Sequence, residues 1–332
     1  MPFLYFIFAP DGSEILISKL FNFLLVFLVP AIITCLIFRH KRKIRNITLL
    51  SIAVLLAVPF FLCKSILDRT DWKKIRDEGQ SKVIFTPVPY GPFEQGAAPY
   101  EKPSVKHWMG TDQIGRDVLA RMVYGARVSL AVGLLATSLT LIVGASIGLC
   151  SGYFGGRFDL VIMRIVEIII CFPTFLLLLI LMSIFKDMKF QQSILIVIGV
   201  IGLTGWTGLC RLVRGEALKN RSLPYILSCE SAGMPVPRIL FVHLLPNISG
   251  PILVSFTFGV AGAILSESAL SFLGFGVQAP TASWGGLLRQ AFSDPFAYWH
   301  LTLWPGLALF ITVCAFNFTG EGLRRILDPR SR

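Results

Sequence analysis

The sequence predicts an all-α integral membrane protein, a bundle of about seven transmembrane helices. Of its 332 residues, 54% are hydrophobic and 15% are charged, whereas soluble domains carry about 25% charged residues. The mean hydropathy is +0.71, and the apolar residues gather in long blocks. This composition excludes a soluble globular enzyme, a disordered chain and a fibrous repeat.

The apolar blocks are long enough to span a bilayer, since a helix needs about 20 apolar residues to cross a hydrocarbon core of about 30 Å. They are apolar on all sides, whereas a soluble amphipathic helix has one apolar stripe. In chain order, the blocks are Ile15–Phe38, Ile47–Leu67, Val128–Cys150, Val161–Phe185, Ser193–Cys210, Ile248–Gly274 and Trp299–Thr319.

These blocks divide the chain into three regions. Residues 1–67 hold two N-terminal helices joined by a basic loop, and residues 68–127 form an external proline-rich loop and the segment that leads into the third helix. Residues 128–332 form a five-helix core with a cytoplasmic loop at 211–247. Because prolines do not fit helix interiors or central strands, we expect no second folded domain in the external loop.

The charges predict the orientation of the helices. Residues 39–46 hold five basic residues and no acid, and short basic loops of this kind lie in the cytoplasm. The N-terminus is then outside and the C-terminus is cytoplasmic, and the cytoplasmic segments carry most of the net charge of +12. Because topology accounts for this basic excess, we expect no nucleic-acid partner.

Motifs for catalysis and for cofactor binding are missing from the sequence. It contains no Walker A loop, no zinc-protease motif and no nucleophile elbow, and its seven cysteines form no C-x-x-C pair. We therefore expect a non-catalytic subunit with no cofactor and no metal site. Glu167 and Glu267 are the two acids within the apolar blocks, fewer than an ion-coupled carrier usually needs.

The cytoplasmic loop has a pattern that predicts a short helix held at both ends. Pro224 suits the first position of a helix, and Gly233 suits the left-handed position that ends one. Pro235 and Pro237 then prevent continuation. The local pattern leaves two interpretations open, an ordinary amphipathic loop helix and a lever that passes motion from a partner protein to the bundle.

This loop resembles the EAA loop of ABC-importer permeases. Gly233 and Leu245-Pro246 match its glycine and its terminal Leu-Pro, whereas Leu-Ser-Cys replaces its Glu-Ala-Ala and His243 replaces an isoleucine. The resemblance implies that the loop couples the permease to an ATPase. The residues it implies are Pro224, Leu227, Ser228, Cys229, Ala232, Gly233 and Pro246.

Four further segments, in the same order, resemble peptide/nickel importer permeases of the oligopeptide- and dipeptide-permease C type. They are HWMGTDQIGRDVLARMVYGARVSL at 107–130, GYFGGRFDLVIMR at 152–164, Phe172-Pro173, which resembles a helix-start proline of the family, and LSESALSFLGFG at 265–276. The glycines at 152, 155 and 156 predict a sharp turn between two helices. The resemblance covers about residues 107–332, and the combined motifs are highly specific. Such permeases usually have six helices, so the sequence implies a six-helix core with one extra N-terminal helix.

The resemblance implies one permease subunit of an ATP-driven importer in a bacterial inner membrane, carrying peptides or related small solutes. Its implied partners are a second homologous permease, two cytoplasmic ATPase subunits and an external solute-binding protein. The alternative is a secondary transporter or channel, which is expected to show inverted repeats or interrupted helices with charged sites at mid-depth.

Two groups of polar residues remain with open roles. Asp112, Arg116, Asp117 and Arg121 are expected to form an external ion-pair set that anchors the third helix or docks the binding protein. Exposed pairs of this kind contribute little individually. Glu267 and Ser271 either line the pathway or its gate, or form a polar clasp between helices.

Two residues of the fourth block carry further expectations. Pro173 is expected to kink the fourth helix and help it bend during gating. Glu167 is expected to open this helix, where the helix dipole favours a carboxylate.

Overall fold

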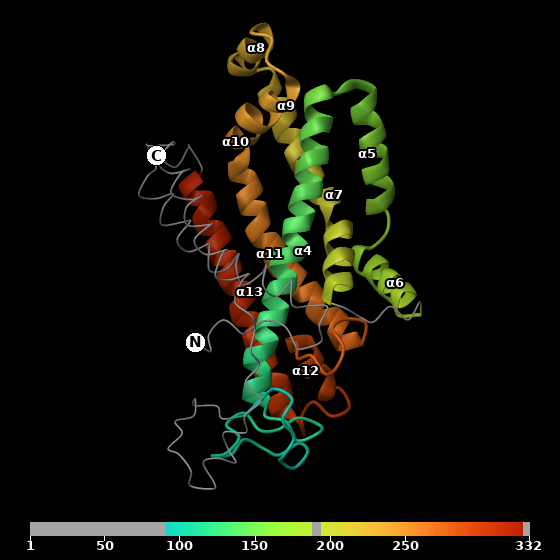
Figure 1. Cartoon of the computed structure of the whole chain (residues 1–332), viewed down its shortest axis with the longest axis vertical. Coiled ribbons are helices and arrows are strands. Elements are labelled where there is room, and N and C mark those ends of the chain that lie inside the picture. Colours follow the sequence, from blue (N-terminus) through green and yellow to red (C-terminus); the bar gives the residue numbers. More distant parts are fainter. Residues whose placement is uncertain (1–89, 188–193, 328–332) are drawn as a thin grey trace, which may run out of the picture. The chain divides into compact units, whose positions relative to one another are not determined.

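The computed structural model describes residues 90–187 and 194–327, which are mostly helical (Figure 1). Four helices in this part of the chain are long and apolar enough to cross a membrane, and one bent pair of helices adds a fifth candidate. They correspond to the five predicted blocks from Val128 onwards. The blocks Ile15–Phe38 and Ile47–Leu67 lie outside the described residues, so the count of seven stays a prediction.

The long helices are α4 (Val118–Phe154), α7 (Ile194–Arg221), α11 (Ser249–Leu273) and α13 (Trp299–Leu327). The bent pair is α5 (Gly156–Ile170) and α6 (Thr174–Asp187). The short elements are α8 (Pro224–Ser231), α9 (Val236–Arg238), a π-helical turn η2 (Ile239–Leu244), α10 (Leu245–Asn247) and α12 (Trp284–Gln290).

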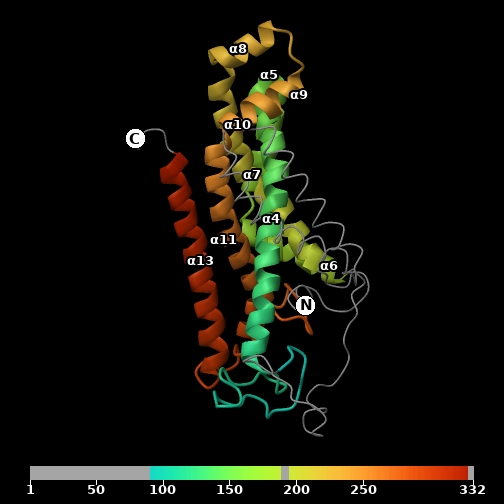
Figure 2. The same ribbon diagram turned by 60° about the vertical axis from the view of Figure 1, so that its left-hand side comes forward.

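Helix α4 packs closely against α7 and α11 (Figures 1 and 2). Glycines of α4 permit this approach, because a Cβ on Gly144 would lie 2.8 Å from the carbonyl oxygen of Trp206, and one on Gly152 would lie 2.6 Å from the Cβ of Ala217. Small residues let membrane helices pack backbone to backbone. With 37 residues, α4 is about 55 Å long at 1.5 Å per residue.

The turn from α4 to α5 is as sharp as its glycines predict. Gly155 and Gly156 have φ angles of 65° and 57°, a region that a residue with a Cβ rarely adopts. After this turn, Asp159 accepts a 2.6 Å hydrogen bond from Ser151 of α4 and pairs with Arg214 of α7. These contacts join the beginning of α5 to both neighbouring helices.

The fourth predicted helix bends at Pro173 as expected, but the bend is a complete break between two helices rather than a kink within one. Helix α5 ends at Ile170, α6 begins at Thr174, and the two are bent by 81°. Proline lacks an N–H and disfavours a helical conformation in the residue before it, whereas its carbonyl accepts a 3.0 Å bond from Leu177 in the first turn of α6. Pro173 therefore starts a new helix.

The role expected for Glu167 was wrong. It lies in the last turn of α5 instead of the first, and the negative end of a helix dipole does not favour a carboxylate. Glu167 instead pairs with Arg164, one turn earlier, at 2.7 Å.

Two other boundaries differ from the prediction. Helix α7 continues to Arg221, and α13 continues to Leu327, so residues 211–221 and 320–327 are helical rather than loop and tail. Hydrophobicity marks where a helix leaves the apolar region, and the backbone can continue as a helix into water.

Candidate functional site

Helix α8 and the elements that follow it to Asn247 form what we call the α8 segment, at one end of the bundle (Figure 1). Pro224 occupies the first turn of α8, and Gly233 has a φ of 69°, so both backbone predictions are confirmed. The N–H groups of Gly233 and Met234 donate to the carbonyls of Glu230 and Cys229 at 2.9 and 3.1 Å. This pair of bonds is a Schellman motif, which fixes the end of the helix.

One side of α8 is buried and the other is free. Ile226 and Cys229 pack with Ile239, Leu240 and Leu244 in a core cluster that includes residues of α4 and α7. The residues left on the outer side of α8 are Pro224, Leu227, Ser228, Ala232 and Gly233. The residues that the resemblance to the EAA loop groups together therefore differ in burial. Cys229 is part of the core, whereas its neighbours face outward.

Hydrogen bonds tie α8 to the ends of α4 and α7. The hydroxyl of Tyr153 in α4 donates to Glu230 Oε1 at 2.7 Å, and that of Tyr225 donates to Asn220 of α7 at 3.3 Å. Burial raises the pKa of the Tyr225 hydroxyl. Sequence reasoning missed the Tyr153–Glu230 contact, since 77 residues separate its partners.

The chain that leads from α8 back to the bundle is helical from Val236 to Asn247. Val236–Arg238, η2 and α10 follow one another without a gap, and α11 begins at Ser249. Pro246 lies in the first turn of α10 and is exposed. π-Helical turns are frequent at functional sites, and this one lies between α8 and α11 in the chain.

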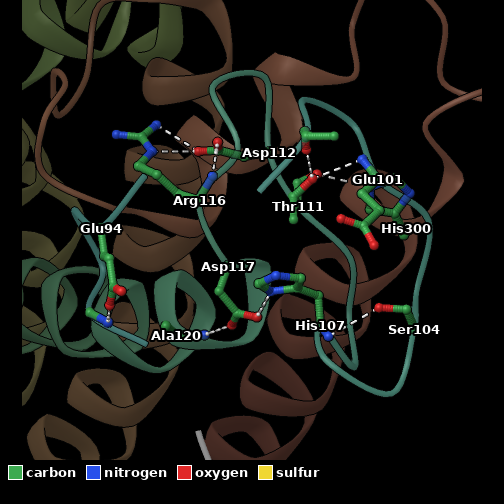
Figure 3. A network of polar contacts seen from close by, with 12 residues as sticks. Glu94, Glu101, Ser104, His107, Thr111, Asp112, Arg116, Asp117, Ala120 and His300 are labelled. Carbon is green, nitrogen blue, oxygen red and sulfur yellow. Dashed lines mark hydrogen bonds and ion pairs between the residues drawn. The ribbon is translucent and has the colours of Figure 1, made fainter. Parts of the chain in front are cut away.

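Residues 90–117, which we call the cap segment, cover the beginning of α4 at the opposite end of the bundle (Figures 1 and 3). Asp112 lies at its centre. Its carboxylate accepts hydrogen bonds from the backbone N–H of Arg116 at 3.0 Å and from Arg116 Nε at 2.7 Å, and Arg121 Nε lies 3.3 Å away. All three side chains are at least 95% buried.

Two histidines make further contacts in the cap, His107 with Asp117 and His300 with Thr111 (Figure 3). Asp117 caps α4 by accepting a 2.8 Å bond from the N–H of Ala120 and pairs with His107 Nδ1 at 2.8 Å. His300 of α13 contacts the carbonyl oxygen of Thr111 at 3.1 Å through Nε2. No local sequence pattern predicts the His300 contact, because 189 positions separate its partners.

The expectation of an exposed ion-pair set was wrong. The four charged residues are buried and divide between two networks, one around Asp112 and one around Asp117. Burial follows from the fold of the cap segment, which turns sharply at Gly110 and Gly115 with φ angles of 79° and 76°. At Gly115 a Cβ would collide with the carbonyl of Ala97, so only glycine lets the segment close over the charges.

Glu267 lies fully buried in α11. Ser271, one turn later, donates to Oε1 at 2.7 Å, and Ser129 of α4 donates to Oε2 at 3.0 Å. Ser271 also accepts the N–H of Val277 at 3.0 Å. Both carboxylate oxygens are therefore occupied by contacts within the chain, a geometry that supports the clasp and leaves the gate role a prediction.

Comparison with known proteins places the chain in a family. Residues 118–332 match the family described as binding-protein-dependent transport system inner membrane component. The chain belongs to this family. The permease is thus a multi-pass membrane subunit of an ABC importer, and family membership favours this function over the secondary transporter or channel.

Several bacterial permeases resemble it over most of their length. The dipeptide transport system permease protein DppC of Alkalihalophilus pseudofirmus is 41% identical over 233 residues, 69% of this chain and 74% of that protein. The glutathione transport system permease protein GsiD of Pectobacterium atrosepticum is 38% identical over 230 residues, 69% of this chain and 75% of its own. The oligopeptide transport system permease protein OppC of Bacillus subtilis is 39% identical over 231 residues, 69% and 74% of the two chains.

The fold is shared with a solved ABC transporter. A chain of the MetNI methionine ABC transporter in an inward-facing conformation aligns with a TM-score of 0.52 at 17% sequence identity, over 63% of this permease and 97% of that chain. At this identity the similarity concerns the fold alone. It agrees with the prediction of an all-α membrane permease.

Proposed function

We propose that this permease forms half of the translocation pathway for peptides or related small solutes. The relatives named for dipeptide, oligopeptide and glutathione transport support this solute class. The proposed partners are a second homologous permease, two cytoplasmic ATPase subunits and an external solute-binding protein. The chain itself acts without catalysis, and its partners hydrolyse ATP.

The observation that carries the coupling proposal is the geometry of α8. Its inner side is fixed to α4 and α7 through a buried cluster, its end is fixed by a Schellman motif, and its outer side is free for an ATPase. A helix held in this way moves with the bundle. Closure of the ATPases then shifts α8, and the bundle changes between inward- and outward-facing states as a rigid-body motion.

The proposed orientation puts α8 in the cytoplasm and the cap segment outside. The basic loop at 39–46 supports it, as do Arg211, Arg214, Lys219 and Arg221 near the α8 end. The cap then lies where a binding protein delivers solute. Its buried charges favour an anchoring role for the cap over direct docking through these four residues.

Reconstitution of the complete transporter in proteoliposomes tests the function. Solute together with its binding protein is expected to stimulate ATP hydrolysis and to drive uptake, whereas the isolated permease is expected to hydrolyse no ATP because it lacks a Walker A loop. ATPase activity of the isolated chain that is lost on mutation of this chain contradicts the proposal. A panel of di- and tripeptides, glutathione and nickel chelates identifies the solute.

A further inference from the structure

An ion pair lies exposed on a helix that is otherwise suited to lipid. Between Leu160 and Phe185 the sequence has two charged residues, Arg164 and Glu167. Arg164 Nη1 donates to Glu167 Oε2 at 2.7 Å, yet the side chains remain 77% and 59% exposed. Their pairing is local to α5, and the described part of the chain does not cover them.

The position of the pair along α5 places it in the apolar zone of the bundle. Asp159 bonds to Ser151, which directly follows the apolar block of α4 that ends at Cys150, and to Arg214 of α7. The polar boundary at this end of the bundle therefore lies near Asp159. Arg164 and Glu167 lie about 8 and 12 Å farther along the helix at 1.5 Å per residue, beside apolar parts of α4 and α7.

Helix α5 exposes two faces of different character at 3.6 residues per turn. The charged face contains Arg157, Arg164 and Glu167, with exposed Leu160 among them, and continues one turn later to exposed Cys171. The adjacent exposed face is apolar and contains Phe158, Val161, Ile165 and Ile168. The inner side is buried through Asp159 and Val166.

The apolar face suits lipid, whereas the charged face does not. Charged residues within membrane segments face a bundle interior or a water-filled cavity, because lipid removes their hydration. The ion pair replaces one hydrogen bond to water for each side chain. The other donors of Arg164 and acceptors of Glu167 would have no partner in lipid. Water on this face would satisfy them.

We propose that the face of α5 carrying Arg164 and Glu167 lines the water-filled part of the solute pathway. The inference rests on the proposed function, since it requires a pathway next to this subunit. A wall with both signs of charge suits zwitterionic solutes, because a guanidinium binds a carboxylate and a carboxylate binds an ammonium group. The helix break at Pro173 ends this wall, where α6 turns away by 81°.

Accessibility to a charged thiol reagent in the complete transporter tests the proposal. Three otherwise cysteine-free permeases are compared in proteoliposomes, one keeping native Cys171, one with Glu167→Cys and one with Ile165→Cys on the apolar face. A trimethylammonium methanethiosulfonate reagent is expected to modify Cys171 and Glu167→Cys about tenfold faster than Ile165→Cys, because thiols ionise in water and not in lipid. Excess transported solute is expected to slow the first two.

The alternatives give different results. Equally slow modification at all three positions means that the face contacts lipid, and it overturns the proposal. Fast modification in the isolated permease with complete protection in every state of the transporter means a dry contact with a partner subunit, which also overturns it. Solute uptake is measured on the same proteoliposomes. Thiols that stay unreactive while uptake is normal reject this inference alone. Loss of binding-protein-dependent uptake before any reagent is added rejects the proposed function.

Discussion

The hydroxyl of Tyr153 and the carboxylate of Glu230 are joined by a 2.7 Å hydrogen bond that connects the last turn of α4 to α8. Because α4 packs against α7 and α11, this bond links α8 to the centre of the bundle. Buried contacts of Ile226 and Cys229 provide the apolar part of the same connection. We regard this bond as the polar half of the coupling joint.

Tyr153→Phe is expected to weaken coupling without detaching the ATPases. The change removes one hydrogen bond to a carboxylate, worth up to about 2 kcal/mol, and keeps the ring in place. The measurement is the number of solute molecules taken up per ATP hydrolysed, which is expected to fall. Glu230→Gln serves as the matched variant, because its amide oxygen still accepts the bond; an equal fall in both variants contradicts this account.

Gly233→Val is expected to reduce transport and to release the ATPases or free them from control by solute. The φ of 69° costs a residue with a Cβ about 1 kcal/mol or more, whatever space surrounds it, and here a Cβ meets no atom within 4 Å. Transport and co-purification of the ATPases measure the effect. Gly262→Val is the control, since Gly262 also has open space but lies within α11 at an ordinary φ; normal transport by Gly233→Val shows that the loop is not a sensitive lever.

Asp112→Asn is expected to destabilise the permease by about 3–5 kcal/mol, because it leaves buried Arg116 without its partner charge. Thermal unfolding of the purified protein measures this loss. Glu321→Gln is the comparison, since Glu321 and Arg324 are 44% and 70% exposed and such pairs are worth about 1 kcal/mol or less. Similar unfolding temperatures for the two variants would mean that the cap ion pair adds no stability.

Ser129→Ala is expected to destabilise the α4–α11 contact by about 1–3 kcal/mol, because it removes the 3.0 Å bond to Oε2 of buried Glu267 and leaves that oxygen only the longer 3.3 Å bond from Ser268 of the same helix. Ser138→Ala on the same helix is expected to have little effect, as its hydroxyl bonds only to the carbonyl of Leu134 in its own helix. A double-mutant cycle of Ser129→Ala with Glu267→Gln measures the coupling energy. Strictly additive losses contradict the clasp.

Single cysteines test the proposed orientation. In a cysteine-free permease, Ser231→Cys on α8 is expected to react with an impermeant maleimide only from the cytoplasm, and Val105→Cys in the cap only from outside. Both side chains are exposed, the second by 94%. Labelling with the opposite pattern reverses the topology derived from the basic loop.

The sequence predicted local backbone features well, because single residues determine them. Pro224 begins α8, Gly233 ends it with a positive φ, and Gly155 and Gly156 form a tight turn, as expected from the absence of a Cβ or of an N–H. The lengths of the apolar blocks predicted five of the membrane segments with approximate bounds. The predicted ends at Cys210 and Thr319 were too early, since hydropathy reports the membrane boundary and not the end of a helix.

Sequence alone thus determined the class, the family and the position of the short helix α8, because hydrophobic length, proline and glycine chemistry, and motif spacing are local properties. Only the tertiary structure decided which polar residues meet. Asp112 and Arg121 are buried because the cap segment folds over them, and Glu267 finds Ser129 from 138 residues away. The exposure of Arg164 and Glu167 likewise depends on how α5 packs. The free energy of a charged side chain depends on the water and polar groups around it, and only the packing of the helices determines these.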